Sequence, residues 1–140
     1  MSVPNGIDLI LTDHEMVDAL FAEFDDTRDA TVVGQIIGQL SLHDEAEHAA
    51  LYPFAMTKLS NTALFERSEA AHSAVKRQID HLVGLEGDAL VAAVAALRKL
   101  VDTHVKDEEK NLLPKLAEAS TAAELDSLGA RILQAKQRGG

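Results

Sequence analysis

Apolar residues recur at intervals of three and four along most of the chain, and this periodicity is typical of amphipathic α-helices. In the first predicted helix, Leu9, Met16, Leu20 and Phe24 follow this spacing. Polar or glycine-containing stretches interrupt the pattern and divide it into four long helices, over about residues 6–26, 30–59, 61–85 and 89–118. Because short connections make successive helices antiparallel neighbours, the sequence predicts an all-α fold, an up-down-up-down four-helix bundle.

A short fifth helix is predicted after the bundle. Thr121 and Glu124 form the T-x-x-E signature of a capping box, which opens a helix over about residues 121–137. The tail KQRGG at the end of the chain is expected to fray. Pro53 and Pro114 fall inside the second and fourth helices, where a missing N–H and a crowded preceding turn should produce a kink or a local break at Pro53 and a kink near Pro114.

The composition limits the classes of protein that fit. With 140 residues, 46% of them hydrophobic and 26% charged, the chain is predicted to form a single soluble domain over residues 1–140. A net charge of -10 argues against nucleic acid or an anionic membrane as a partner, and no apolar run is long enough for a membrane span. The lack of cysteine excludes disulfides, thiolate catalysis and cysteine-ligated metals, and the lack of a basic leader favours a cytoplasmic location.

One sequence motif, called the repeated phrase below, occurs twice in related form, as HDEAEHAALYP beginning at His43 and as HVKDEEKNLLP beginning at His104. The two phrases align without a gap and pair His43 with His104 and Glu47 with Glu108. A spacing of four residues puts each His and Glu on one face of its helix, about 6 Å apart. A repeated imidazole–carboxylate pair is a suitable ligand set for two metal ions.

Two further histidines are predicted to lie at the same depth in the bundle. A helix advances about 1.5 Å per residue, so the predicted helix ends place His14 opposite His43 and His72 opposite His104. With the two glutamates of the repeated phrase, four histidines from four helices then form one layer. Burying these six polar groups without a partner would be costly, so the layer predicts a bound metal.

The other two histidines fail this geometric test. His48 lies about 140° from His43 around its helix, and His81 lies about 180° from His72. Both are therefore predicted to face solvent. The same prediction holds for the carboxylates of residues 25–26 and 44–45.

With these residues and spacings, the chain resembles the hemerythrin-like family, also called the HHE cation-binding domain. The match covers residues 7–118 and rests on DH at 13–14, HDEAEHAALYP, EAAH at 69–72 and HVKDEEKNLLP. The resemblance implies a non-heme di-iron centre bridged by two carboxylates and an oxo or hydroxo group. Carried over residue by residue, it implies that one iron is held by His14 and His43, the other by His72 and His104, with bridges from Glu47 and Glu108.

The sequence departs from the pattern of the family's oxygen carriers on the third helix. Those proteins have H-x-x-x-H there, whereas the residue four after His72 is Lys76. The resulting gap can stay open, hold water or be approached by Glu69, which forms an E-x-x-H pair with His72 as in ferritin-like proteins. On the fourth helix the carriers' spacing selects Glu109, but the internal repeat selects Glu108, so Glu109 is kept in reserve.

These features predict a di-iron protein that binds O2 and reacts with peroxide or nitric oxide inside a helical bundle. The missing imidazole should expose one iron and favour turnover over reversible oxygenation, so a catalase-like or other oxidoreductase activity is left open. The alternatives are a sensor or carrier of oxygen or iron without turnover, and a ferritin-like di-metal protein that handles iron. Manganese and zinc accept the same ligands, so the sequence does not choose the metal.

Overall fold

The computed structural model describes residues 5–139, which form helices joined by short connections and contain no strand. Two of the long helices each contain one wide π turn, called η1 and η2. In chain order the elements are α1 (Gly6–Thr27), α2 (Ala30–Ala46), η1 (Glu47–Leu51), α3 (Tyr52–Lys58), α4 (Thr62–Leu82), α5 (Gly87–Asp107), η2 (Glu108–Leu112), α6 (Leu113–Ala119) and α7 (Ala122–Gly139). The expected all-α class and the four long helices are confirmed.

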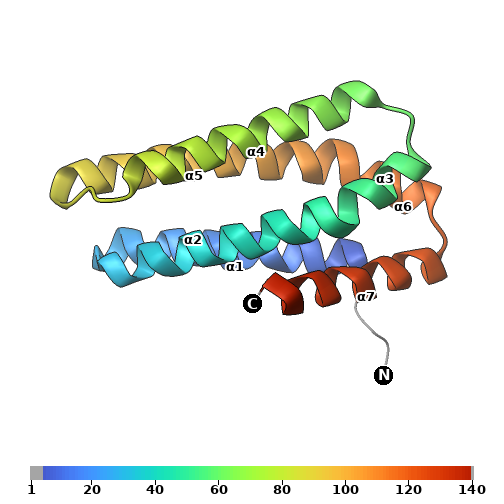
Figure 1. Ribbon diagram of the computed structural model, residues 1–140, viewed down its shortest axis with the longest axis horizontal. Coiled ribbons are helices and arrows are strands. Elements are labelled where there is room, and N and C mark those ends of the chain that lie inside the picture. The colour runs from blue at the N-terminus through green and yellow to red at the C-terminus, as the bar shows by residue number, and fades with distance from the viewer. Residues whose placement is uncertain (1–4, 140) are drawn as a thin grey trace.

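The long helices form an antiparallel bundle with α7 added along one side (Figure 1). α1 packs against α2 and α4 packs against α5, while α3 and α6 continue α2 and α5 beyond their π turns. α7 packs against α1, α2 and η1. The short fifth helix of the sequence prediction is therefore present, and it covers the outside of the first helical hairpin.

Local signals in the sequence fix where the helices begin. Asn5 accepts a hydrogen bond from the backbone N–H of Asp8 and so caps α1. Thr121 and Glu124 make both hydrogen bonds of a capping box at the start of α7. The turn between α4 and α5 contains Gly84, whose φ of 86° lies in the left-handed region that favours glycine.

Each of the two internal prolines follows a π turn, and the helix continues through it without a break. The N–H of Tyr52 bonds to the carbonyl of Glu47, five residues earlier, and Pro53 follows at once. The N–H of Leu113 bonds in the same way to Glu108, before Pro114. A proline lacks an N–H and crowds the preceding turn, and the wider turn accommodates this without ending the helix.

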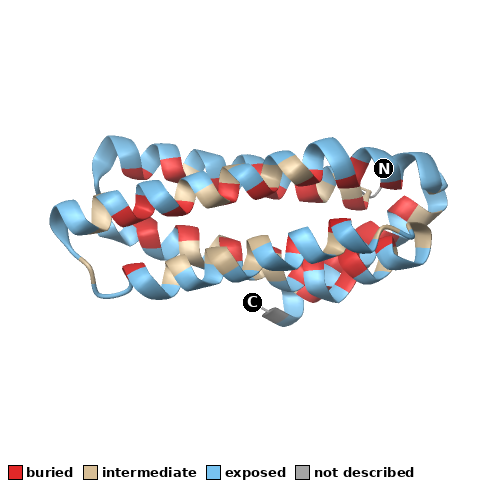
Figure 2. Ribbon diagram, turned by 90° about the horizontal axis from the view of Figure 1, so that it is seen from above, coloured by how far each residue is buried: buried red, intermediate tan, exposed pale blue. Residues whose placement is uncertain are grey.

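The apolar core is divided into two clusters, and Figure 2 shows buried positions on the inner faces of the helices along the length of the bundle. One cluster contains Ile10, Leu51, Leu112 and Ile132, and the other contains Phe21, Ile36, Leu97 and Val101. On each of the four helices, the histidine of the predicted layer falls between residues of the two clusters. The polar layer is thus enclosed by hydrophobic packing on both sides.

The C-terminal tail differs from its prediction. α7 stays helical to Gly139, so the tail KQRGG continues the helix over residues 136–139, and its last residue lies outside the described residues. Ile132 and Ala135 pack into the core just before the tail, and Lys136 makes an ion pair with Asp13 of α1. These tertiary contacts stabilise a terminus that helix propensity alone would leave frayed. Within residues 5–139, no helix is both long and apolar enough to cross a membrane.

Candidate metal centre

The predicted layer exists in the folded protein. Five of its six side chains are buried, and Glu47 and Glu108 are 0% and 1% exposed. The sixth, His72, is intermediate in exposure. The six side chains and their elements are His14 on α1, His43 on α2, Glu47 on η1, His72 on α4, His104 on α5 and Glu108 on η2.

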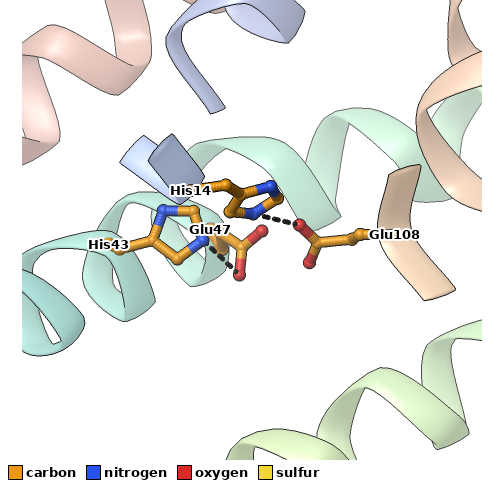
Figure 3. Close-up of side chains that lie close together, drawn as sticks. All are labelled: His14, His43, Glu47 and Glu108. Atoms are coloured by element: carbon orange, nitrogen blue, oxygen red, sulfur yellow. Dashed lines mark ion pairs between the residues drawn. The ribbon is translucent and has the colours of Figure 1, made fainter. Parts of the chain in front are cut away.

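The six side chains fall into two groups that share both glutamates. His14 and His43 form one group with Glu47 and Glu108, and Figure 3 shows these four side chains converging, with His14 from α1, His43 and Glu47 from the continuous helix of α2 and η1, and Glu108 from η2. His72 and His104 form the second group with the same two glutamates. Within each group, one candidate ligand atom from every residue lies within 4.8 Å of the others. Two carboxylates are thus shared between two pairs of imidazoles, and each of the two groups could hold a metal ion.

Every imidazole of the layer turns its Nε2 atom inward, toward a carboxylate oxygen. The distances from Nε2 to the nearest carboxylate oxygen are 3.2 Å for His14 to Glu108, 3.2 Å for His43 to Glu47, 3.0 Å for His72 to Glu47, and 2.9 Å for His104 to Glu108. Four nitrogen atoms and two carboxylates therefore face one small volume. This donor set suits borderline divalent ions such as iron, manganese and zinc.

The outer nitrogen of three imidazoles contacts a carboxylate behind it. The Nδ1 atom lies 2.8 Å from Glu109 in His14 and 2.9 Å from Asp13 in His43, and in His72 it contacts Asp44. A carboxylate at Nδ1 accepts a hydrogen bond from the Nδ1–H group of a neutral imidazole and leaves the lone pair of Nε2 free to face inward. This is the usual support of a metal-bound histidine, and it orients three of the four rings.

Unsatisfied polar atoms are concentrated in this layer. Among the described residues, seven buried side-chain nitrogen or oxygen atoms make no hydrogen bond of good geometry, although several lie close to an opposite charge, and all but Ser120 Oγ belong to the layer. The six are His14 Nε2, His43 Nε2, Glu47 Oε2, both ring nitrogens of His104, and Glu108 Oε1. Buried polar atoms without partners are costly, so their convergence fits bound cations that complete their interactions.

The layer also shifts the pKa values of its members. Burial disfavours the charged imidazoles, but nearby carboxylates outweigh it. Asp44 and Glu47 raise the pKa of His72 to about 9, and Glu108 and Glu47 raise the pKa of His104 to about 10. The pKa of His43 is also raised well above its usual value, because Glu47 and Asp13 outweigh burial. The pKa of Glu47 is held well below its usual value by His43, His104 and His72 despite burial. Without a metal, protons on His43, His72 and His104 therefore supply positive charge to the layer.

Tyr52 is a polar member of this region that the sequence analysis did not single out. Its hydroxyl group lies 2.7 Å from Nε2 of His72, 2.9 Å from Glu108 and 3.3 Å from Glu47. Burial and the two glutamate charges raise the pKa of this phenol, so it is neutral and able to donate a hydrogen bond. The hydroxyl thus lies beside His72, which is the single layer histidine of the third long helix, where the second imidazole of the oxygen-carrier pattern is missing.

The reserve residues of the sequence analysis lie outside the layer. Glu109 is exposed and contacts the outer nitrogen of His14, so it supports a ring rather than joining the six inner groups. Glu69 is also exposed, and its carboxylate lies 2.6 Å from His48 instead of approaching the gap on the third helix. Lys76 lies at the surface, in a pocket beside His72.

His81 is exposed, as predicted. His48 is also exposed, although it contacts both Asp44 and Glu69. The prediction for Asp44 is only half right. Its carboxylate is partly exposed, but it also contacts the outer nitrogen of His72, because α4 lies beside it in the bundle.

The carboxylates that contact the outer nitrogens of His14, His43 and His72 share a sequence feature, which becomes recognisable once the structure is known. Each is the immediate neighbour of a residue of the layer: Asp13 precedes His14, Asp44 follows His43, and Glu109 follows Glu108. Adjacent helical residues point about 100° apart. Each of these carboxylates therefore contacts a layer imidazole on a neighbouring helix, and not the layer residue next to it in sequence. The signal is an acidic residue directly beside a ligand candidate.

Comparison with known proteins agrees with this geometry. The family model of the hemerythrin HHE cation-binding domain matches residues 5–116, and the chain belongs to this family. Its fold is similar to the crystal structure of a hemerythrin HHE cation-binding domain-containing protein from Mycobacterium kansasii, with a TM-score of 0.85 and 18% sequence identity over 97% of this chain and 87% of that one. At that identity the likeness establishes the fold. No curated protein matches the sequence.

Proposed function

We propose that the six side chains of the layer hold two iron ions, one at His14 and His43 and the other at His72 and His104, with Glu47 and Glu108 shared between them. The observation that supports this most directly is the set of unpartnered buried atoms that face one another inside the layer. Membership of a cation-binding family and the two four-residue groups with shared glutamates support it as well. Manganese and zinc fit the same donors, and metal analysis distinguishes them.

Bound iron would supply electron transfer to O2, peroxide or nitric oxide. The chain supplies the surroundings of that chemistry. The two apolar clusters limit access of water to the layer, and the carboxylates behind His14, His43 and His72 keep their rings oriented. We propose that the protein binds O2 and reacts with peroxide or nitric oxide, with a catalase-like activity as the enzymatic form of this function.

The protein surface comes close to the layer at His72. A surface pocket of about 560 Å³ borders His72 and is lined also by Asp44, His48, Glu69 and Lys76. Tyr52 holds its hydroxyl group on the inner side of the same imidazole. Ligand exchange is therefore proposed at the His72 and His104 side, where the third helix offers one imidazole and solvent comes close.

The second candidate function is an oxygen or iron sensor or carrier without turnover. The same layer supports it, because reversible binding and turnover need the same protein ligands and differ in whether the bound small molecule is released unchanged or converted. The ferritin-like alternative has less support, because Glu69 faces His48 at the surface instead of the layer.

Metal analysis of anaerobically purified protein, followed by optical spectra on adding O2, peroxide and nitric oxide, tests the proposal. Two iron ions per chain and sustained O2 evolution from peroxide would support an enzyme. A slowly reversible oxygenated spectrum would support a carrier or sensor. A chain that binds no iron, manganese or zinc after anaerobic reconstitution would refute the metal centre itself.

A further inference from the structure

The C-terminal helix reaches the candidate metal centre through a single lysine. Lys136 of α7 makes an ion pair with Oδ1 of Asp13 on α1. The other oxygen of this carboxylate, Oδ2, lies 2.9 Å from Nδ1 of His43 on α2. Lys136, Asp13 and His43 therefore form a continuous chain of contacts from α7 to the inner layer.

Asp13 differs from the other carboxylates that support an imidazole. Its side chain is 5% exposed, whereas the side chains of Asp44 and Glu109 are 49% and 39% exposed. Water can solvate the charge of the two exposed carboxylates, but it has little access to Asp13. The positive charge of Lys136 takes the place of solvent there, because a buried carboxylate is stable only when it is paired.

The position of Lys136 is fixed by packing. Leu128, Ile132 and Ala135 of α7 are buried in the same apolar cluster as Ile10 of α1. Lys136 comes one turn after Ile132, and its side chain is 23% exposed. α7 thus packs on both α1 and α2, and its lysine meets the buried carboxylate of α1.

We propose that Lys136 is a positioning residue of the metal centre, holding Asp13 against the outer nitrogen of His43 and so setting the affinity of the ion at His14 and His43. This inference rests on the proposed function of the layer. The ion at His72 and His104 has no such connection, because His72 is supported by the half-exposed Asp44, and the outer nitrogen of His104 has no partner. The two ions should accordingly bind with different strengths, and only one should depend on α7.

The test compares two lysines with the same exposure. Lys58 also pairs with a carboxylate on α7, Glu124, and its side chain is likewise 23% exposed, but it does not reach the layer. Anaerobic titration with Co²⁺ should give two ions for the natural chain. Lys136→Met should weaken one ion about 10- to 100-fold and leave the other unchanged, Lys136→Arg should restore it, and Lys58→Met should bind both as the natural chain does.

A second measurement follows the histidine ring directly. In ¹⁵N-labelled metal-free protein, the Nδ1–H signal of His43 should shift in Lys136→Met and in Asp13→Asn, and stay in place in Lys58→Met. Equal Co²⁺ binding and equal His43 signals in Lys136→Met and Lys58→Met would overturn this inference and leave the proposed function intact. Failure of the natural chain to bind Co²⁺ would refute the proposed function, while the metal-free signal would still decide the role of Lys136.

Discussion

Glu47 and Glu108 occupy the same position in two π turns, each as the first residue of the wide turn that precedes a proline. The carbonyl of each glutamate accepts the N–H five residues later, and its side chain points into the layer. The repeated phrase therefore repeats a backbone conformation as well as two side chains. π turns occur often at functional sites, and here they bring both shared carboxylates to one depth.

Replacing either shared glutamate by glutamine should remove most of the bound metal. Glu47→Gln and Glu108→Gln keep the shape of the side chain but delete an anion that faces both pairs of imidazoles. Metal per chain after anaerobic reconstitution measures the effect. Glu109→Gln is the matched control next in sequence, and it should lose far less, because Glu109 is exposed and contacts only the outer nitrogen of His14. Equal losses in Glu108→Gln and Glu109→Gln would contradict the assignment.

The metal-free protein should lose stability as the pH rises above neutral. The folded pKa values of about 9 for His72 and about 10 for His104 exceed the value of about 6.5 expected for unfolded histidine. Their stabilisation is complete below about pH 6.5 and is lost as the pH rises through the folded values. Melting temperatures of metal-free protein between pH 6 and 10 measure this decline. A flat profile over that interval would show that the imidazoles are not paired with the glutamates.

Metal binding at neutral pH should release protons. His72 and His104 are protonated at pH 7 in the metal-free protein, because their pKa values are about 9 and about 10, and a metal binds only the neutral imidazole. We expect about two or more protons per chain, and an apparent affinity that increases with pH up to about 10. Calorimetry in buffers with different heats of ionisation counts the protons. A heat of binding that is independent of the buffer would argue against this charge state.

Removing the hydroxyl of Tyr52 should destabilise the metal-free protein. Tyr52→Phe keeps the ring but deletes a hydroxyl that lies within hydrogen-bond distance of Glu108 and His72. The cost should be about 1–3 kcal/mol, measured by denaturant unfolding. Tyr52 is also the single tyrosine in a chain without tryptophan, so its fluorescence should report metal binding to the adjacent layer. Tyrosine fluorescence that stays constant up to a saturating metal concentration would show that Tyr52 does not lie beside the bound metal.

Introducing a second imidazole on the third helix should make the centre less reactive. Lys76 lies one turn after His72, on the surface pocket beside it, where the family's oxygen carriers have another histidine. Lys76→His should hold iron more tightly, oxidise more slowly in air and turn over less peroxide, each by about tenfold. Lys115→His, which changes an exposed lysine of α6, is the control. Unchanged autoxidation and peroxide turnover in Lys76→His would show that the missing imidazole does not set the reactivity.

The sequence by itself determined the helices and the depth of the layer. Apolar periodicity gives the face of each residue, and a constant rise per residue gives its height, so spacing alone brings His14, His43, His72 and His104 to one level. The repeat also favoured Glu108 over Glu109, and the structure places Glu108 inside the layer and Glu109 outside it.

Only the tertiary structure decided which side chains touch across helices. Periodicity does not say how far each helix is rotated toward its neighbours. The contacts of Asp13 with His43 and of Asp44 with His72 could therefore not be predicted from the sequence. Tyr52 was missed because the second phrase has Leu113 in its place. Lys136 was assigned to a frayed tail, since its partner Asp13 is adjacent only once α7 has packed onto α1. Sequence spacing determines the height and face of each side chain on its own helix, and packing between helices determines which side chains of other helices it contacts.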